Sequence, residues 1–480
     1  MEEDLINDRL KKLEGLKALG IEPFGRKFNA THSTEDILKK YGEKEFKENE
    51  ETEEDVSIAG RITIIRGHGK AAFVNMQDRF GKIQIYIRKD FVGEEQFKIY
   101  ENVDMGDFIA VTGSVFKTHT GELTIKAKKI FFLAKSLRPL PEKWHGLKDV
   151  ETRFRQRYLD FISSPDVRKI FSLRTKILRS IREFLDEKGY TEVETPMLHS
   201  ISGGAAAEPF KTFHNALSME LYLRIAPELY LKRLIVAGME KVYEINRSFR
   251  NEGISTRHNP EFTMVEIYTA YADYNDVMDL TEDLISNAAL KALGTKKITF
   301  DSKEIDLETP WKRIPYYQAL KEATGKDLIV LSEPEIRDYT KEQNINIQDC
   351  KTKDEMVNQI FEKLVEPKLI QPTFVIDYPV SISPLAKSKR DNPEIVERFE
   401  LFINGGELAN AYSELNDPIE QRKRFELQGG TIDEDFVLAL EHGMPPTGGL
   451  GIGIDRLVML LTDSKSIREV ILFPQLKKEK

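Results

Sequence analysis

The stretch Tyr243–Tyr271, YEINRSFRNEGISTRHNPEFTMVEIYTAY, is the part of the chain around which the rest is organised. Two runs with strand-like alternation, Tyr243–Arg250 and Glu261–Thr269, enclose a loop rich in glycine, asparagine and arginine. Alternating runs joined by a loop of this composition are typical of an antiparallel hairpin. The sequence therefore predicts a long hairpin here.

The two predicted strands carry unusually polar faces for the centre of a sheet. Because side chains alternate across a strand, every second residue shares one face. A solvated amphipathic hairpin would explain this polarity without any chemistry. The residues that share these faces are Asn246, Ser248 and Arg250 on the first run, and Phe262, Met264, Glu266 and Tyr268 on the second.

The loop between the runs supplies charged groups and ends near an aromatic ring. Arg250 and Glu252 precede a second cationic pair, Arg257 and His258, and Phe262 follows four residues later. Planar arginine groups bind carboxylates and phosphates, and an aromatic face can stack on a purine. Such a set could hold a carboxylate, a purine and a polyphosphate together.

The same residues carry a resemblance to a known family. The segments FRNE, RHNPEF and VEIYTAYADY resemble motif 2 of class II aminoacyl-tRNA synthetases, in the form characteristic of the lysyl-tRNA synthetase family. Phe184–Met197, FLDEKGYTEVETPM, resembles motif 1, and Gly448–Leu461, GGLGIGIDRLVMLL, resembles motif 3. The similarity runs from about Val56 to the C-terminus, and three motifs in the family's order make it specific.

The resemblance implies an α+β fold. An N-terminal OB-fold β-barrel should precede a class II catalytic domain built on an antiparallel sheet flanked by helices. The expected regions are a helical extension and linker at 1–55, an OB-fold anticodon-binding domain at 56–135, a linker at 136–152, and a catalytic domain at 153–480. The catalytic domain should hold motif 1 at about 184–197, motif 2 at about 243–271, motif 3 at about 448–461, and a helical insertion at about 300–368.

The composition is that of a large globular protein. The chain has 480 residues, 40% of them hydrophobic, which is enough for several cores. A single cysteine, Cys350, excludes a disulfide framework and a cysteine-based zinc site. No apolar run reaches transmembrane length, so we expect a cytoplasmic protein without a membrane partner. The net charge of -9 argues weakly against nucleic acid, although lysines gather between Lys126 and Lys143.

Between Val56 and Leu133 the chain consists of five short β-rich runs punctuated by glycine. Strands of this length and number favour a small closed barrel of the OB type. Such a barrel could be no more than a spacer. The resemblance instead assigns Phe73, Gln84 and Glu122 to anticodon binding, where an aromatic ring stacks on an unpaired base and polar groups contact base edges.

One loop departs from the family pattern. The segment GGAAAEPF at 203–210 has Glu208 where the family has an arginine, so we expect Glu208 to lie outside the ligand contacts and retain only Gly204. Further along, Glu228 stands in an otherwise apolar helical pattern and needs a partner. Lys232, one helical turn later, is one possible partner. The resemblance assigns Glu228 to the α-ammonium group of the amino-acid substrate.

A second hairpin is predicted near the C-terminus, where VERFELFI and ELANAYSEL flank a turn at 404–406. Alternation places Asn410, Tyr412 and Glu414 on one face. It places Glu407 on the other face, unless a bulge or an early bend turns it inward. Charges at a strand edge would explain both glutamates, whereas the resemblance implies that they bind magnesium.

The resemblance implies that a homodimer activates L-lysine with ATP and transfers it to the 3′ end of tRNA(Lys). The catalytic residue should be Arg250, which would hold the reacting carboxylate and the α-phosphate during in-line attack. Up to three Mg²⁺ ions would accompany ATP at Glu407 and Glu414. The implied ATP-binding residues are Arg250, Glu252, Arg257, His258, Phe262, Glu407 and Arg456. The implied lysine-binding residues are Gly204, Glu228, Arg250, Glu266, Tyr268, Asn410, Tyr412 and Glu414.

Three other interpretations share much of this pattern. An aspartyl- or asparaginyl-tRNA synthetase has the same architecture, but an aspartate substrate would need a cation where this chain has Glu266 and Glu414. A protein lysyltransferase could use the same site, although such relatives lack the barrel. A non-catalytic RNA-binding paralogue would have no need to retain Arg250 and Arg456.

Overall fold

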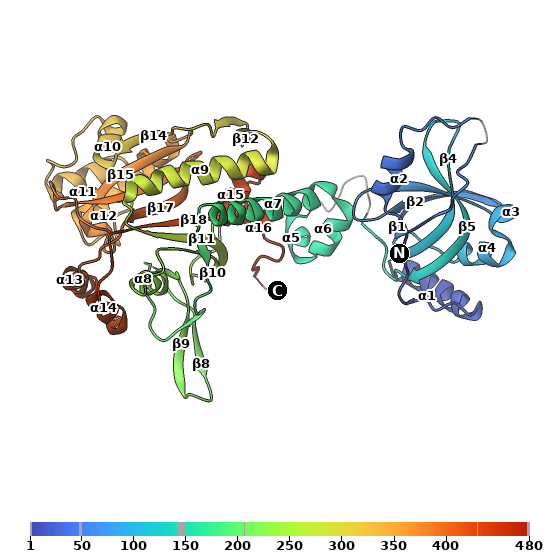
Figure 1. Cartoon of the computed structure of the whole chain (residues 1–480), viewed down its shortest axis with the longest axis horizontal. Coiled ribbons are helices and arrows are strands. Elements are labelled where there is room, and N and C mark those ends of the chain that lie inside the picture. The colour runs from blue at the N-terminus through green and yellow to red at the C-terminus, as the bar shows by residue number, and fades with distance from the viewer. Residues whose placement is uncertain (1, 48–49, 142–148, 206, 430, 478–480) are drawn as a thin grey trace. The chain divides into compact units, whose positions relative to one another are not determined.

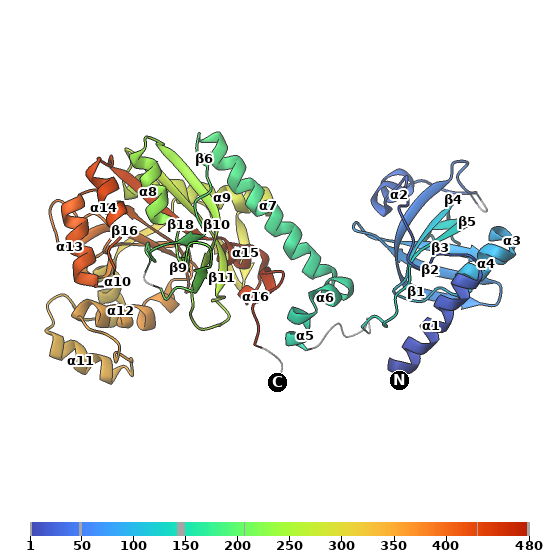
Figure 2. The ribbon, with the colours of Figure 1, turned by 90° about the horizontal axis from the view of Figure 1, so that it is seen from below.

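The computed structural model describes residues 2–47, 50–141, 149–205, 207–429 and 431–477. The chain divides into two compact units, Met1–Lys148 and Asp149–Lys480 (Figures 1 and 2). The predicted linker at 136–152 is described only in part, because residues 142–148, which include Lys143, lie outside the described residues. The same holds for Ala206 in the loop at 203–210.

Five strands form a closed barrel in the first unit, in the order β1-β2-β3-β5-β4, which confirms the predicted barrel (Figure 1). Alternation fills its interior, because Ala72, Val74 and Met76 are buried and the residues between them are half-buried. The strands are β1 (Val56–His68), β2 (Ala71–Gln77), β3 (Lys82–Arg88), β4 (Phe108–Lys117) and β5 (Leu123–Ala134), and helices α3 (Lys89–Val92) and α4 (Glu94–Glu101) follow β3.

Two helices near the N-terminus pack on this barrel, α1 (Glu2–Ala18) and α2 (Thr34–Tyr41). Leu16 of α1 and Ile37 of α2 belong to the same hydrophobic cluster as the barrel interior. Thr34, the first residue of α2, is hydrogen-bonded to Asp78, which directly follows β2 of the barrel. The backbone N–H and the hydroxyl of Thr34 donate to the carboxylate of Asp78, at 2.7 and 2.6 Å. The N-terminal helices are therefore part of the first unit's core.

An eight-stranded sheet organises the second unit, in the order β14-β15-β16-β17-β18-β11-β10-β6. The predicted hairpin at 243–271 forms its β10–β11 pair, with Lys241 opposite Thr269 and Phe249 opposite Glu261. Only the β14–β15 and β10–β6 pairs are parallel among the described strands of this sheet. The strands are β6 (Thr191–Glu192), β10 (Lys241–Phe249), β11 (Glu261–Ala270), β14 (Lys312–Pro315), β15 (Thr373–Pro379), β16 (Ile395–Phe402), β17 (Glu407–Ser413) and β18 (Thr447–Gly453).

Helices cover one face of this sheet and form the main core. Long helices α7 (Pro165–Glu187) and α9 (Tyr274–Leu293) pack there with α15 (Ile454–Thr462). On the other face, α8 (Glu228–Val236) and α14 (Glu434–Glu441) pack at one end. Further elements of this unit are α5 (Val150–Arg155), α6 (Arg157–Ser163), α13 (Pro418–Gln428), α16 (Ile467–Val470), η2 (Val380–Ile382), and the small sheet of β7 (Leu198–His199), β8 (Lys211–His214) and β9 (Met219–Leu223).

The stretch at about 300–368, predicted as a helical insertion, is helical only in part. It contains α10 (Tyr316–Thr324), α11 (Glu333–Glu342), α12 (Lys353–Leu364) and η1 (Glu366–Lys368). Before these helices the chain forms the hairpin of β12 (Lys297–Phe300) and β13 (Lys303–Asp306), and then β14. Because β14 pairs with β15, the prediction is wrong for this part, which is an edge of the central sheet.

Candidate active site

A cavity of about 910 Å³ lies over the face of the central sheet that α7 and α9 leave free. Strand β11 shows how alternation produces it. Met264, Glu266 and Tyr268 line the cavity, whereas Val265 and Ile267 belong to the main core on the other face. The polar face predicted for this hairpin is therefore a cavity wall, and its buried members show that it is not a solvated face.

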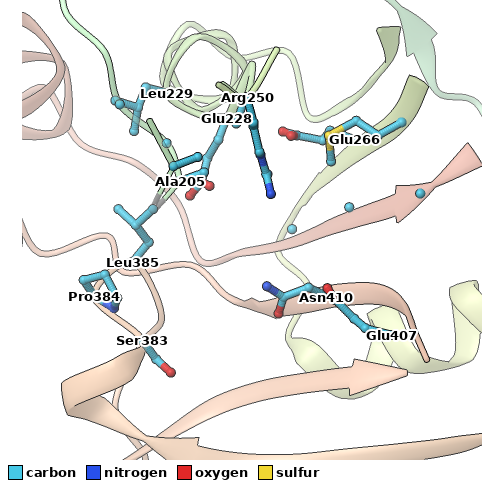
Figure 3. A pocket seen from close by; sticks show the side chains of 18 of the residues that line it. Ala205, Glu228, Leu229, Arg250, Glu266, Ser383, Pro384, Leu385, Glu407 and Asn410 are labelled. Carbon is cyan, nitrogen blue, oxygen red and sulfur yellow. The ribbon is translucent and has the colours of Figure 1, made fainter. Parts of the chain in front are cut away.

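Every residue predicted to bind ATP or lysine lines this cavity, although the individual roles stay predictions. Figure 3 shows Glu228, Arg250 and Glu266 reaching in from one side, and Asn410 and Glu407 lying on the opposite side. The predicted residues that the fold brings together are Gly204, Glu228, Arg250, Glu252, Arg257, His258, Phe262, Glu266, Tyr268, Glu407, Asn410, Tyr412, Glu414 and Arg456.

A fully buried lysine stands behind one end of the cavity. The Nζ atom of Lys232 lies 2.6 Å from Oε1 of Glu228 and also contacts the carboxylate of Glu414. The hydroxyl of Tyr412 donates to the same Glu228 oxygen at 2.9 Å. Burial disfavours the charge on Lys232, but the two carboxylates outweigh it and raise the pKa of its ammonium group. Lys232 is thus the partner of Glu228, as one of the two interpretations from sequence expected.

A third carboxylate at this end forms no ion pair with a described side chain, although the charge of Arg250 acts on it from further away. Glu266 is 4% exposed and accepts a hydrogen bond from the hydroxyl of Tyr268 at 3.2 Å. Burial and the nearby charge of Glu228 raise the pKa of Glu266 well above its usual range. Burial likewise raises the pKa of Tyr268, so its hydroxyl stays protonated and can donate to Glu266.

At the other end of the cavity, arginines lie beside an aromatic ring and a histidine. The guanidinium group of Arg250 lies 5.1 Å from the ring centroid of Phe262. Arg456 donates to the backbone oxygen of Glu407 at 2.7 Å and lies 3.1 Å from its carboxylate. Nη2 of Arg456 is 3.3 Å from Nε2 of His258. This end combines cationic groups with a stacking surface.

Glu407 reaches the cavity through an irregularity of the β16–β17 pair. Leu401 pairs with Ala409, and the next residue, Phe402, pairs with Glu407, so that Leu408 is an extra residue on β17. A bulge of this kind reverses the faces of the residues on its far side, here Glu407, which precedes Leu408. Glu407 therefore lies on the same side as Asn410, and the orientation that alternation left open is determined by the register.

Glycines of β18 form the floor of the cavity, a role that the sequence did not predict. A Cβ atom on Gly449 would lie 1.8 Å from Oε1 of Glu414, and one on Gly451 would lie 3.1 Å from Cε of Met264. No side chain can be added at Gly449 without displacing the carboxylate. The alternation of Gly449, Gly451 and Gly453 in motif 3 could have indicated a strand face without side chains.

Arg398 of β16 is a further cavity residue that sequence reasoning missed. It donates to Asn410 at 3.1 Å, to Ser383 at 2.8 Å and to Glu400 at 2.6 Å, and so orients Asn410 in the cavity wall. The run VERFELFI mixes apolar and charged residues, so an arginine there gave no distinct signal for this role. The side chain of Glu208 is exposed and is not among the described residues that line the cavity, and its place outside the ligand contacts stays a prediction.

The three barrel residues predicted to bind an anticodon are neighbours on β2, β3 and the turn before β5. Gln84 donates to the carboxylate of Glu122 at 2.8 Å. The ring of Phe73 stacks on Tyr86 with centroids 4.7 Å apart, and Phe73 is half-buried while its neighbour Val74 is fully buried. Phe73 therefore lies on the outer face of the barrel and not in its core.

Comparisons with known proteins agree with this geometry. Residues 149–477 match the family of class II tRNA synthetases for D, K and N, and residues 56–133 match the OB-fold nucleic acid binding domain. The chain is 57% identical to the lysine–tRNA ligase of Carboxydothermus hydrogenoformans, with 99% of this chain and 98% of the relative covered. It is 56% identical to that of Halalkalibacterium halodurans (99% and 97% covered) and 54% identical to that of Bacillus cereus (99% of each).

The antiparallel sheet, the cavity above it and the matched family define a class II aminoacyl-tRNA synthetase with an OB-fold domain. Within that class the chain belongs to the lysine–tRNA ligases, which activate lysine with ATP and attach it to tRNA. The predicted fold and activity are confirmed, and the aspartyl, asparaginyl and non-catalytic alternatives are not favoured. Among the described residues, no helix is both long and apolar enough to cross a membrane.

Proposed function

We propose that the cavity binds lysine with both of its ammonium groups against buried carboxylates. The observation that carries this proposal is a charge balance. Glu228, Glu266 and Glu414 are each at most 6% exposed and line the cavity, and among the described residues Lys232 is the one cation that forms ion pairs with them. Burial raises the pKa of Glu266 and of Glu414, so their ionised forms call for further positive charge. The two ammonium groups of lysine supply the remaining positive charge, since buried carboxylates are stable only when paired.

In this arrangement Glu266, Tyr268 and Glu414 surround the ε-ammonium group, and Glu228 binds the α-ammonium group. Gly204, Asn410 and Tyr412 complete the walls. The left-handed backbone of Gly204, with φ of 89°, supports the close approach that its loop would make to the substrate. An aspartate substrate would place a third negative charge among these carboxylates, so the pocket selects against it.

Arg250 is the catalytic residue in our proposal. Its Nε atom is buried without a hydrogen-bond partner among the described residues, so its planar group is available to a ligand. The lysine carboxylate attacks the α-phosphorus of ATP in line, the bond to the β-phosphate oxygen breaks, and pyrophosphate leaves. Arg250 holds the attacking carboxylate and the α-phosphate in a bidentate arrangement and neutralises their charge.

The remaining ATP contacts follow from the residues at the same end of the cavity. Phe262 and Arg456 enclose the adenine ring, and Glu252 accepts a hydrogen bond from its amino group. Arg257 and His258 reach the outer phosphates. Their position in the loop after β10, on the cavity wall, supports this assignment.

Magnesium fits the residues present. Oε1 of Glu414 is buried and accepts no hydrogen bond from the described part of the chain, and Glu407 supplies a second carboxylate. No group of three or more possible ligand residues occurs in that part of the chain. Two carboxylates together with ATP phosphates are the usual donor set for Mg²⁺. When bound, the ion would neutralise phosphate charge.

We further propose that Phe73, Gln84 and Glu122 bind the anticodon of tRNA(Lys), and that the protein acts as a cytoplasmic homodimer. The half-buried ring of Phe73 on the outer face of the barrel supports base stacking. The exposed apolar side chains of Met197, Leu198 and Phe213, in and near motif 1, support a subunit interface.

The site is tested by ATP–pyrophosphate exchange with a panel of amino acids and lysine analogues. Lysine should support exchange, aspartate and asparagine should not, and analogues that lack either ammonium group should bind much more weakly. Equal use of norleucine, which has no ε-ammonium group, would refute the charge-balance assignment. Exchange without any amino acid would contradict the ordered positioning of both substrates.

A further inference from the structure

Arg257 lies at the boundary between two cavities. It lines the large cavity and also a second one of about 470 Å³, whose other walls include residues of α12, η1, β16 and α15. His258 and Glu407 line both cavities as well. The side of Arg257 that faces away from the proposed lysine site therefore has a defined environment of its own.

The guanidinium group of Arg257 rests on the turn between β16 and β17. Its Nη1 atom donates to the backbone oxygen of Gly405 at 2.8 Å. A Cβ atom on Gly406 would lie 3.1 Å from Nη1 and 3.3 Å from Cζ, so the guanidinium group packs directly against this glycine and would have to shift slightly for any larger residue. Gly405 has φ of 65° and packs against Pro367 of η1, where an added Cβ would lie 3.1 Å from Cα. Arginine, turn and η1 thus form one packed unit.

Glu366 of η1 supplies the opposing charge. Its Oε1 atom lies 3.5 Å from Nη1 of Arg257, and its side chain is 22% exposed. Burial raises the pKa of Glu366 to about 7, with Glu407, Glu362 and Glu400 adding to the effect and Arg257 opposing it. A polyphosphate at Arg257 would have the same sign of charge as this carboxylate. Glu366 and the polyphosphate would therefore compete for the guanidinium group of Arg257.

We propose that Glu366 is a positioning residue that competes with polyphosphate for Arg257 and thereby favours the release of pyrophosphate. This inference rests on the proposed contact of Arg257 with the outer phosphates. ATP draws Arg257 from Glu366 when it binds. After pyrophosphate has formed, the return of Arg257 to Glu366 and Gly405 removes a cation from the product.

The test compares Glu366→Gln with the parent enzyme in ATP–pyrophosphate exchange and in inhibition by added pyrophosphate. An ion pair of this exposure has an effect of about two- to fivefold. Loss of the carboxylate should therefore lower the KM for ATP and the inhibition constant of pyrophosphate by about two- to fivefold, and leave the KM for lysine unchanged. Glu366→Asp, which keeps the charge, should restore both constants toward the parent values.

Glu362→Gln is the matched control. Glu362 lines the same second cavity but accepts hydrogen bonds from Asn358 and Gln359, at 2.8 and 3.0 Å, on its own helix. It should change both constants less than Glu366→Gln does. Equal changes in the two variants would mean a general charge effect and overturn the proposal, as would a rise in the inhibition constant of pyrophosphate in Glu366→Gln. Thermal unfolding confirms that each variant is folded.

Arg257→Ala separates this inference from the function on which it rests. If Arg257 contacts the phosphates, the substitution raises the KM for ATP; an unchanged KM would refute that contact. In the Arg257→Ala background, Glu366→Gln should no longer alter either constant. A KM that rises with Arg257→Ala, combined with an undiminished effect of Glu366→Gln in the double variant, would refute the competition alone.

Discussion

Lys232 and Glu228 form a buried ion pair at 2.6 Å, on consecutive turns of α8, and the same ammonium group contacts Glu414, which directly follows β17. Lys232 of the chain therefore contacts Glu228 and Glu414, two of the carboxylates that we propose to bind the ammonium groups of the lysine substrate. Removing either glutamate would leave a buried charge with one partner fewer.

Glu414→Gln should nearly abolish lysine activation. It removes a charge from the proposed ε-ammonium pocket and the proposed metal site, and it removes one partner of Lys232. Loss of a partner of a buried charge costs about 3–5 kcal/mol, which corresponds to at least about a hundredfold lower rate of exchange at a given lysine concentration. Exchange kinetics within about threefold of the parent enzyme would contradict the assignment.

Arg250→Lys should be severe although the positive charge is kept. A single ammonium group cannot hold a carboxylate and a phosphate in the planar arrangement that a guanidinium group provides. Single-turnover measurement of adenylate formation should show the loss in the chemical step, with a smaller change in the apparent affinity for ATP. Preserved turnover with weaker ATP binding alone would place Arg250 outside the reacting centre.

Phe73→Ala should separate the two halves of the reaction. Stacking of a base on an aromatic ring contributes about 1–3 kcal/mol, so tRNA charging should fall about 5- to 150-fold while lysyl-adenylate formation is unchanged. Val74→Ala is the control, since Val74 is fully buried and points into the barrel. It should lower the melting temperature of the first unit more than Phe73→Ala does, and reduce charging less. Unchanged charging in Phe73→Ala would refute the anticodon role.

The stability of the barrel unit should depend on pH through Asp78. Burial opposes ionisation of Asp78, but hydrogen bonds from Thr34, Gly81 and Phe80 outweigh it and hold the pKa of the carboxyl group below its usual value. A lowered pKa in the folded state means that this stabilisation is complete above the unfolded pKa of about 3.9. It is lost as the pH falls through the folded value.

Asp78→Asn should therefore destabilise the isolated first unit at pH 7, and the difference from the parent should shrink as the pH is lowered below about 4. Urea unfolding followed by circular dichroism at several pH values measures both effects. Asp90→Asn, at an exposed position of the same unit, serves as the control. A difference between Asp78→Asn and the parent that does not depend on pH would show that Asp78 contributes by packing rather than by its charge.

Periodicity was sufficient to predict the β10–β11 hairpin to within two residues at each end, because one of its faces is buried in the main core and the other forms the cavity wall. The orientation of Glu407 could not be predicted, since a bulge depends on the pairing of Leu401 and Phe402 with another strand. Strand β14 was missed because four residues ending in proline carry almost no pattern of their own.

Arg398 was missed for a different reason. Its partners Ser383 and Asn410 lie 15 and 12 residues away and meet it only when η2, β16 and β17 have assembled. The sequence resemblance supplied the residues that touch the substrates, because those residues stand in recognisable motifs. Arg398, which orients Asn410, is defined by tertiary contacts and could be assigned only from the structure. Lys232 was a candidate partner of Glu228 from helical spacing, but its contact with Glu414 could not be predicted.

The floor of the cavity is made of main chain along β18, and this limits how the enzyme can evolve. Glycine has no smaller replacement, so any mutation at Gly449 or Gly451 can only reduce the space above the sheet. A descendant with a different amino-acid preference would have to change the walls on β11 and β17 while this strand stayed as it is. The adaptable part of the pocket is therefore confined to its sides.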